Sequence, residues 1–110
     1  MILATIRIRI PQHLKVQALE IIIPATERTR IEPGCLGARI YHDEQQEEIF
    51  LMEAVWQSQE DLDRHLRSDH YRQVLLVTEM SDEPPEVQFR TISQSAGLEI
   101  VEKARSANYR

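Results

Sequence analysis

The side chain best suited to acid–base chemistry is His65. Leu62, His65 and Leu66 follow one another at the helical spacing i, i+3 and i+4, which places the imidazole on the inward edge of a helix. A histidine titrates at about pH 6.5 and can therefore remove a proton from a phenol or an enol. The position also suits a structural histidine whose ring bonds a backbone carbonyl or Asp61, one turn earlier. Both interpretations stay open on the sequence.

Two aromatic residues, Trp56 and Tyr71, lie on either side of His65 in the sequence. Their rings could form the walls of a site for a flat aromatic substrate, with the tyrosine hydroxyl as a hydrogen-bond partner. They would look the same as residues of a core or of a dimer interface. We predict that both bind substrate.

Charged residues on predicted strands are the other candidates. Glu53 stands in an otherwise apolar stretch, so its carboxylate must be paired, hydrogen-bonded or protonated. We predict a catalytic role for Glu53; the alternative is a structural ion pair with Arg39 or Arg90 across the sheet. We also predict that Arg90 binds an anionic or carbonyl group of the substrate, together with Arg7 and Arg9, although a solvated strand face explains these arginines equally well.

The stretch that must position these side chains is residues 49–56, an almost continuously apolar strand with two buried faces. Ser58 is placed to cap a helix after it, and Ser68 to cap a second one. These helices cover one face of the strand. The other face needs a second sheet, which a second copy of the protein supplies most simply, so we predict a homodimer. The apolar stripe expected on the second helix is Tyr71, Val74, Leu75 and Thr78.

The remaining elements complete a β-α-β-β-α-β order. Residues 2–10 alternate as a strand, and a helix follows from Gln12 to the turn at residues 32–34, with a kink or break expected at Pro24. Residues 35–42 and 86–92 are further strands. We predict an α+β, ferredoxin-like fold with a four-stranded antiparallel sheet over residues 1–93. Residues 94–110 form a helical extension of the same domain, with its helix at 94–104 laid over a sheet edge or over the partner.

The bulk composition excludes several classes of protein. The formal net charge of −5 and the scattered basic residues argue against non-specific binding to nucleic acid or to an anionic membrane. No apolar run approaches the roughly 20 residues that span a bilayer, and no signal peptide is visible. A single cysteine, Cys35, fits a reducing compartment, and we expect a cytoplasmic protein. The histidines show no spacing typical of a metal site.

Several of these residues resemble the antibiotic biosynthesis monooxygenase family, over roughly residues 2–92. The similar positions are Glu32-Pro33-Gly34-Cys35-Leu36-Gly37, Tyr41, Glu53-x-x-Trp56-x-Ser58, His65 and Tyr71. The resemblance implies a dimeric α+β barrel in which two sheets pack together, with a pocket between the sheet and the helices of each protomer. It also implies oxygenation of quinols or anthrones without a cofactor. The haem-degrading branch is not matched, because Leu75 stands at its haem-ligand histidine and the first strand lacks its asparagine.

We therefore predict a cofactor-independent monooxygenase that acts on a small electron-rich aromatic molecule such as a quinol or polyphenol. His65 would be the base and Glu53 a second catalytic residue; Trp56, Tyr71 and Arg90 would bind the substrate. No metal or cofactor is expected. Two alternatives remain: a small-molecule-binding or stress-response dimer without turnover, and an isomerase that uses the same histidine without O₂.

Overall fold

The computed structural model describes residues 1–107. Its elements, in chain order, are β1 (Ile2–Arg9), a short 3-10 helix η1 (Gln12–Leu14), α1 (Lys15–Arg30), β2 (Cys35–His42), β3 (Ile49–Trp56), α2 (Gln59–Arg67), α3 (Tyr71–Glu79), β4 (Glu86–Thr91) and α4 (Leu98–Ala107). The predicted element order is confirmed.

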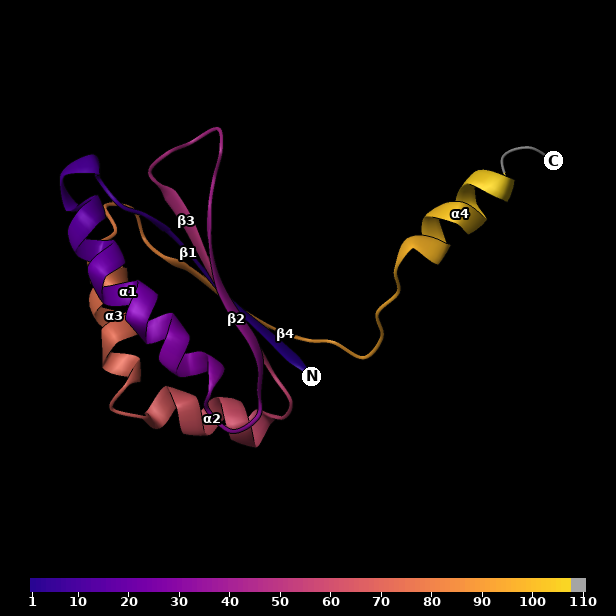
Figure 1. The fold of residues 1–110 in the computed structure, drawn as a ribbon, viewed down its shortest axis with the longest axis horizontal. Coiled ribbons are helices and arrows are strands. Elements are labelled where there is room, and N and C mark those ends of the chain that lie inside the picture. Colours follow the sequence, from indigo (N-terminus) through magenta and orange to yellow (C-terminus); the bar gives the residue numbers. More distant parts are fainter. Residues whose placement is uncertain (108–110) are drawn as a thin grey trace.

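The strands form one antiparallel sheet in the order β2-β3-β1-β4. Helices α1, α2 and α3 all lie on one side of it (Figure 1). We call this side of the sheet the inner face and the opposite side the outer face. This architecture is the predicted α+β, ferredoxin-like fold.

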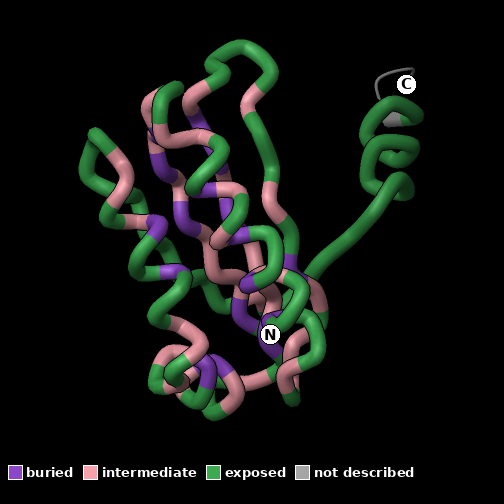
Figure 2. Tube along the Cα trace, turned by 60° about the vertical axis from the view of Figure 1, so that its left-hand side comes forward, coloured by how far each residue is buried: buried purple, intermediate pink, exposed green. Residues whose placement is uncertain are grey.

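The main core lies between the inner face and the helices. In β1, Ile6 and Ile8 are buried with 8% and 3% of their surface exposed, and they belong to one cluster with Ile22 of α1 and Val77 of α3. The alternation of apolar and polar residues in β1 turns these isoleucines inward. Burying each one stabilises the fold by about 1.5–3 kcal/mol. Figure 2 shows the buried positions in the strands and on the sheet-facing sides of the helices.

Helix α1 runs without interruption from Lys15 to Arg30, so of the predicted kink or break at Pro24, the break is wrong. Proline lacks the N–H that would otherwise bond the carbonyl of Glu20. Both residues are exposed, and water can therefore satisfy that carbonyl. The buried side of α1 contains Ala18, Ile22, Ala25 and Thr29.

The two helices after β3 begin close to the predicted caps. Ser58 Oγ accepts a hydrogen bond from the backbone N–H of Asp61. Ser68 Oγ accepts one from the N–H of Tyr71, the first residue of α3. The apolar stripe of α3 differs from the prediction: Val74 and Val77 are its buried residues, whereas Leu75 is 49% exposed.

Beyond β4 the chain leaves the body of the protein. Residues 92–97 lead to α4, which stands apart from the sheet and the other helices (Figure 1). Its apolar residues Leu98, Ile100 and Val101 are all at least half exposed. A helix is therefore present in the predicted extension, but it spans Leu98–Ala107 rather than residues 94–104, and it does not cover an edge of its own sheet. The last residues of the predicted extension, 108–110, lie outside the described part of the chain.

The turn between α1 and β2 is fixed by a glycine. Gly34 has φ of +82°, in the left-handed region that residues with a Cβ rarely adopt. A Cβ at this position would collide with the side chain of Asp61 in α2. The turn is also tied to the end of β3, because the N–H of Gln57 donates to the carbonyl of Gly34 over 2.8 Å.

We predict that Gly34→Ala lowers the free energy of unfolding by about 1–3 kcal/mol, since it adds backbone strain and a collision with Asp61. Urea denaturation measures this change. Gly37→Ala is the matched control, because a Cβ there meets nothing within 4 Å. Equal stability of the two variants would show that the turn does not need glycine at position 34.

Candidate functional site

An apolar cavity lies between the inner face and the helices, and its floor is a row of small side chains. Three alanines stand side by side on neighbouring strands: Ala38 of β2, Ala54 of β3 and Ala4 of β1. Phe89 of β4 continues this row. The adjacent rows contain large residues, including Met52 on one side and Trp56 on the other. The small row therefore leaves a cavity against the helices, which is partly open to solvent.

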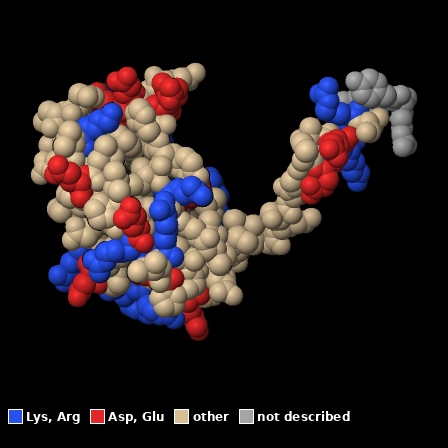
Figure 3. Space-filling view, viewed as in Figure 1, with Lys and Arg blue, Asp and Glu red and all other residues tan. Residues whose placement is uncertain are grey.

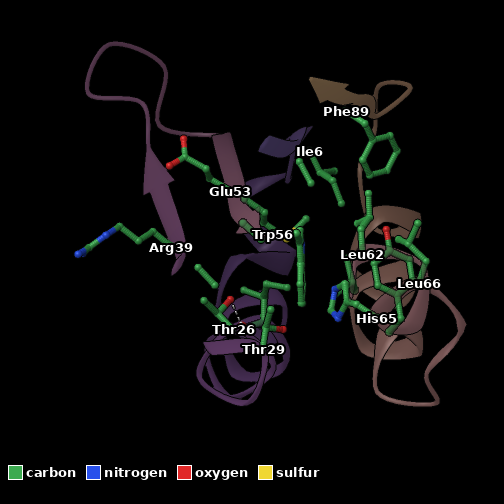
Figure 4. A pocket seen from close by; sticks show the side chains of 17 residues that line it. Ile6, Thr26, Thr29, Arg39, Glu53, Trp56, Leu62, His65, Leu66 and Phe89 are labelled. Carbon is green, nitrogen blue, oxygen red and sulfur yellow. Dashed lines mark hydrogen bonds between the residues drawn. The ribbon is translucent and has the colours of Figure 1, made fainter. Parts of the chain in front are cut away.

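His65 lies in the wall of this cavity, on α2 opposite the strand that carries Trp56 (Figure 4). It is buried, with 5% of its surface exposed, which confirms that it faces inward. The centroid of its ring is 4.6 Å from that of Trp56 and 5.1 Å from that of Tyr71, which it meets edge-on. The structure thus brings together three of the predicted site residues, one base and two aromatic walls.

The hydrogen-bond partner of His65 is Glu32, a residue whose role the sequence did not reveal. Glu32 Oε2 lies 2.7 Å from His65 Nδ1. Within residues 1–107, the ring bonds neither a backbone carbonyl nor Asp61, the two partners considered from the sequence. Asp61 bonds Ser58 and Arg64 instead. Glu32 belongs to the motif at residues 32–37, and an acidic residue in the turn after a helix was the signal that the sequence offered. The contact was not predicted because Glu32 and His65 are far apart in the sequence.

Burial keeps the imidazole neutral. It lowers the pKa of His65 below the usual 6.5, and this effect outweighs the Glu32 carboxylate, which acts in the opposite direction. The other ring nitrogen, Nε2, has no hydrogen bond among the described residues and is not fully enclosed. A neutral imidazole carries one unprotonated nitrogen, so His65 can accept a proton at neutral pH.

Further polar groups surround the ring. His70 Nε2 lies 3.1 Å from Thr29 Oγ1, and the His70 ring is 6.1 Å from that of His65. Burial raises the pKa of Tyr71, so its hydroxyl stays protonated. The indole N–H of Trp56 is buried without a partner within residues 1–107. An unpaired buried donor of this kind is costly, and an acceptor atom of a ligand could satisfy it.

The predicted site residues Glu53 and Arg90 do not join this group. In the strand register Glu53 pairs with Thr5, and Arg90 with Leu3, all on the outer face. Glu53 borders the cavity through its strand, but its side chain points away from Trp56 and His65 (Figure 4). Arg39 is the cross-strand neighbour of Glu53, yet within residues 1–107 the alternative, an ion pair with Arg39 or Arg90, is not formed.

The remaining charges form local pairs. Arg7 pairs with Glu86, and Arg9 with Glu48 and Asp82, which explains these arginines without a ligand. Acidic and basic side chains are interspersed over the body on the face shown in Figure 3. Residues 1–107 contain no cluster of three metal-ligating side chains. None of the described helices is long and apolar enough to cross a membrane.

Filling the alanine row should close the cavity. We predict that Ala54→Leu weakens the binding of 1-naphthol at least about ten-fold, because the added carbons occupy the ligand space. Quenching of Trp56 fluorescence measures binding, since Trp56 is the single tryptophan of the sequence. The control is Ala104→Leu on the exposed surface of α4. Unchanged affinity in Ala54→Leu would mean that naphthol binds elsewhere.

The chain is similar to known proteins in sequence and in fold. It is 27% identical to the uncharacterized protein sll1783 of Synechocystis sp. (strain ATCC 27184 / PCC 6803 / Kazusa) over 73 residues, 66% of this chain and 50% of that protein. The chain thus spans about half the length of this curated relative. A conserved protein from Methanosarcina mazei Go1 shares the fold with a TM-score of 0.76 and 24% identity, covering 81% of this chain and 89% of the other.

A protein described as an antibiotic biosynthesis monooxygenase has a TM-score of 0.77 and 22% identity, with 86% of this chain and all of that chain covered. Residues 1–75 match the antibiotic biosynthesis monooxygenase family. This segment includes Glu32, Trp56, His65 and Tyr71. The chain belongs to the antibiotic biosynthesis monooxygenase family.

Proposed function

We propose that this protein is a cofactor-independent monooxygenase for a small, electron-rich phenol or quinol, with His65 as the base. The observation that carries the proposal is a buried neutral imidazole with one unbonded nitrogen in an apolar cavity walled by aromatic rings. Family membership supports a monooxygenase-type protein. The choice of substrate class rests on the chemistry of the cavity.

The cavity suits a flat and uncharged molecule. The alanine row forms a flat floor, and Trp56, Phe89 and Tyr71 contribute to its boundary. Both charged side chains on its border, Arg39 and Glu53, point away from it in Figure 4. A neutral phenol therefore enters without leaving an unpaired charge in apolar surroundings. The unpaired indole N–H of Trp56 provides one donor for an oxygen of the substrate.

The reaction needs only a base, the phenol and O₂. His65 Nε2 takes the phenol proton, and the resulting phenolate transfers an electron to O₂. The phenoxyl radical and superoxide then combine at a ring carbon that carries hydrogen, which forms a C–O bond. Loss of that hydrogen as a proton and cleavage of the O–O bond yield a quinone and water. The phenol supplies all four electrons, so no other reductant is consumed.

We also propose that the active form is a homodimer joined through the outer face. Leu3, Leu51 and Val55 lie in the middle of this face and are partly exposed, whereas α1, α2 and α3 cover the inner face. A second sheet would remove this apolar strip from water. The single free thiol at Cys35 fits a reducing compartment, and we expect the protein in the cytoplasm.

Oxygen uptake tests the catalytic proposal. We predict protein-dependent consumption of O₂ with at least one substrate from a panel of hydroquinones, naphthols and anthrones, measured with an oxygen electrode. His65→Ala should lower the rate about 10²–10⁴-fold, the usual contribution of a general base. The wild-type rate should be constant at neutral pH and fall on acidification below pH 6.5, where His65 becomes protonated, because burial lowers its pKa.

Heat-denatured protein corrects for autoxidation in this assay. A fully active His65→Ala variant would refute the assignment of the base. Binding of the panel without oxygen uptake would favour a ligand-binding module, and conversion of a substrate under nitrogen would favour an isomerase.

Light scattering tests the dimer. We predict a molecular mass of about twice the 12.9 kDa of one chain at micromolar concentration. Val55→Lys places a charge in the middle of the outer face and should raise the dissociation constant at least about ten-fold. Gln73→Lys adds the same charge on the exposed side of α3 and should have no effect. A monomeric wild-type protein would contradict the proposal.

A further inference from the structure

Backbone hydrogen bonds within the turn and to the end of β3 hold Glu32 in place. Its carbonyl accepts a hydrogen bond from the N–H of Cys35 over 3.1 Å. Two residues later, the carbonyl of Gly34 accepts one from Gln57, at the end of β3. The turn is thus fixed at both ends, and the Glu32 side chain reaches across to α2.

Helix α2 packs against the turn that carries Glu32, and it also carries His65. In its first turn, Asp61 packs against Gly34 so closely that no Cβ fits between them. Asp61 is itself held by Ser58 and Arg64. One turn later, the same helix carries His65. The helix that presents the base therefore also positions the turn that carries the acid.

We propose that Glu32 is a positioning residue that holds His65 in the Nδ1–H tautomer and so directs the lone pair of Nε2 toward the substrate. This inference rests on the proposed role of His65 as a base. A carboxylate accepts hydrogen bonds, so the proton of the neutral ring lies on Nδ1, which is 2.7 Å from Glu32 Oε2. When Nε2 takes the substrate proton, the same carboxylate stabilises the imidazolium that forms.

The other titratable groups near His65 are not placed to do this. The ring of Tyr71 is nearly perpendicular to the imidazole, and the ring of His70 lies 6.1 Å away and bonds Thr29. Asp61, on the same helix, bonds Ser58 and Arg64. Within residues 1–107, Glu32 provides the carboxylate that accepts a hydrogen bond from a ring nitrogen of His65.

The first test is ¹⁵N NMR of the histidine rings, which needs no substrate. Loss of its signal in His65→Gln identifies the His65 ring among the four histidines of the sequence. We expect the Nδ1–H tautomer to predominate in the wild-type protein at neutral pH. In Glu32→Gln we expect the Nε2–H tautomer to appear and the pKa of His65 to fall, because the carboxylate that favours the imidazolium is gone.

Glu27→Gln is the matched control, because it removes an equal charge from an exposed position on α1 and should leave the His65 signals unchanged. With a phenol that the wild-type protein oxidises, Glu32→Gln should lower kcat about ten-fold or more, and Glu27→Gln should not change kcat.

Two results would overturn the proposal: a predominant Nε2–H tautomer in the wild-type protein, or an unchanged tautomer and pKa in folded Glu32→Gln. The tautomer of His65 in the wild-type protein tests the proposal even if Glu32→Gln fails to fold. If no phenol is oxidised but these NMR results appear as expected, the proposed function fails and the role of Glu32 in fixing the ring stands.

Discussion

A hydrogen bond of 2.7 Å between Glu32 and His65 joins the turn after α1 to the helix after β3. We propose that this bond orients the ring of His65, and the bond in turn depends on the packing of the turn against α2. Gly34 allows this packing because it lacks a Cβ and adopts a positive φ. One short motif thus connects the backbone geometry of a turn to the protonation of a buried ring.

The sheet provides two surfaces with different roles. On the inner face, the row of alanines between rows of larger side chains opens a cavity against the helices. On the outer face, Glu53 and its partner Thr5 lie between the apolar residues Val55, Leu3 and Leu51, and Arg90 lies beside Leu3. Glu53, predicted to be catalytic, and Arg90, predicted to bind substrate, therefore lie on the face that we propose to be the dimer interface. There, Glu53 would meet the second copy of the chain rather than the substrate.

The sequence predicts the local elements well, because each depends on a pattern within a few residues. Alternation in residues 2–10 and the caps at Ser58 and Ser68 lead to the observed strand and helices. The inward position of His65 follows from its spacing to Leu62 and Leu66. The uninterrupted helix through Pro24 was not predictable from a proline rule, because the outcome depends on whether water can reach the freed carbonyl.

The site itself depends on contacts between distant residues. Glu32 and His65 are brought together by the fold, and the alanine row exists only in the register of three strands. The face to which Glu53 points follows from its alternation with Met52 and Ala54, once the helices are known to cover the side of those two residues. Such features become predictable when the strand pairing is known, and a single sequence does not supply it.

We propose that the protein transfers one atom of O₂ to a phenol, with His65 as the base. Mass spectrometry of the product formed from 1-naphthol under ¹⁸O₂ tests this transfer. We expect 1,4-naphthoquinone with one ¹⁸O atom from the wild-type protein, and loss of this product in His65→Ala. A quinone whose new oxygen comes from water, or an equally labelled product from His65→Ala, would contradict it.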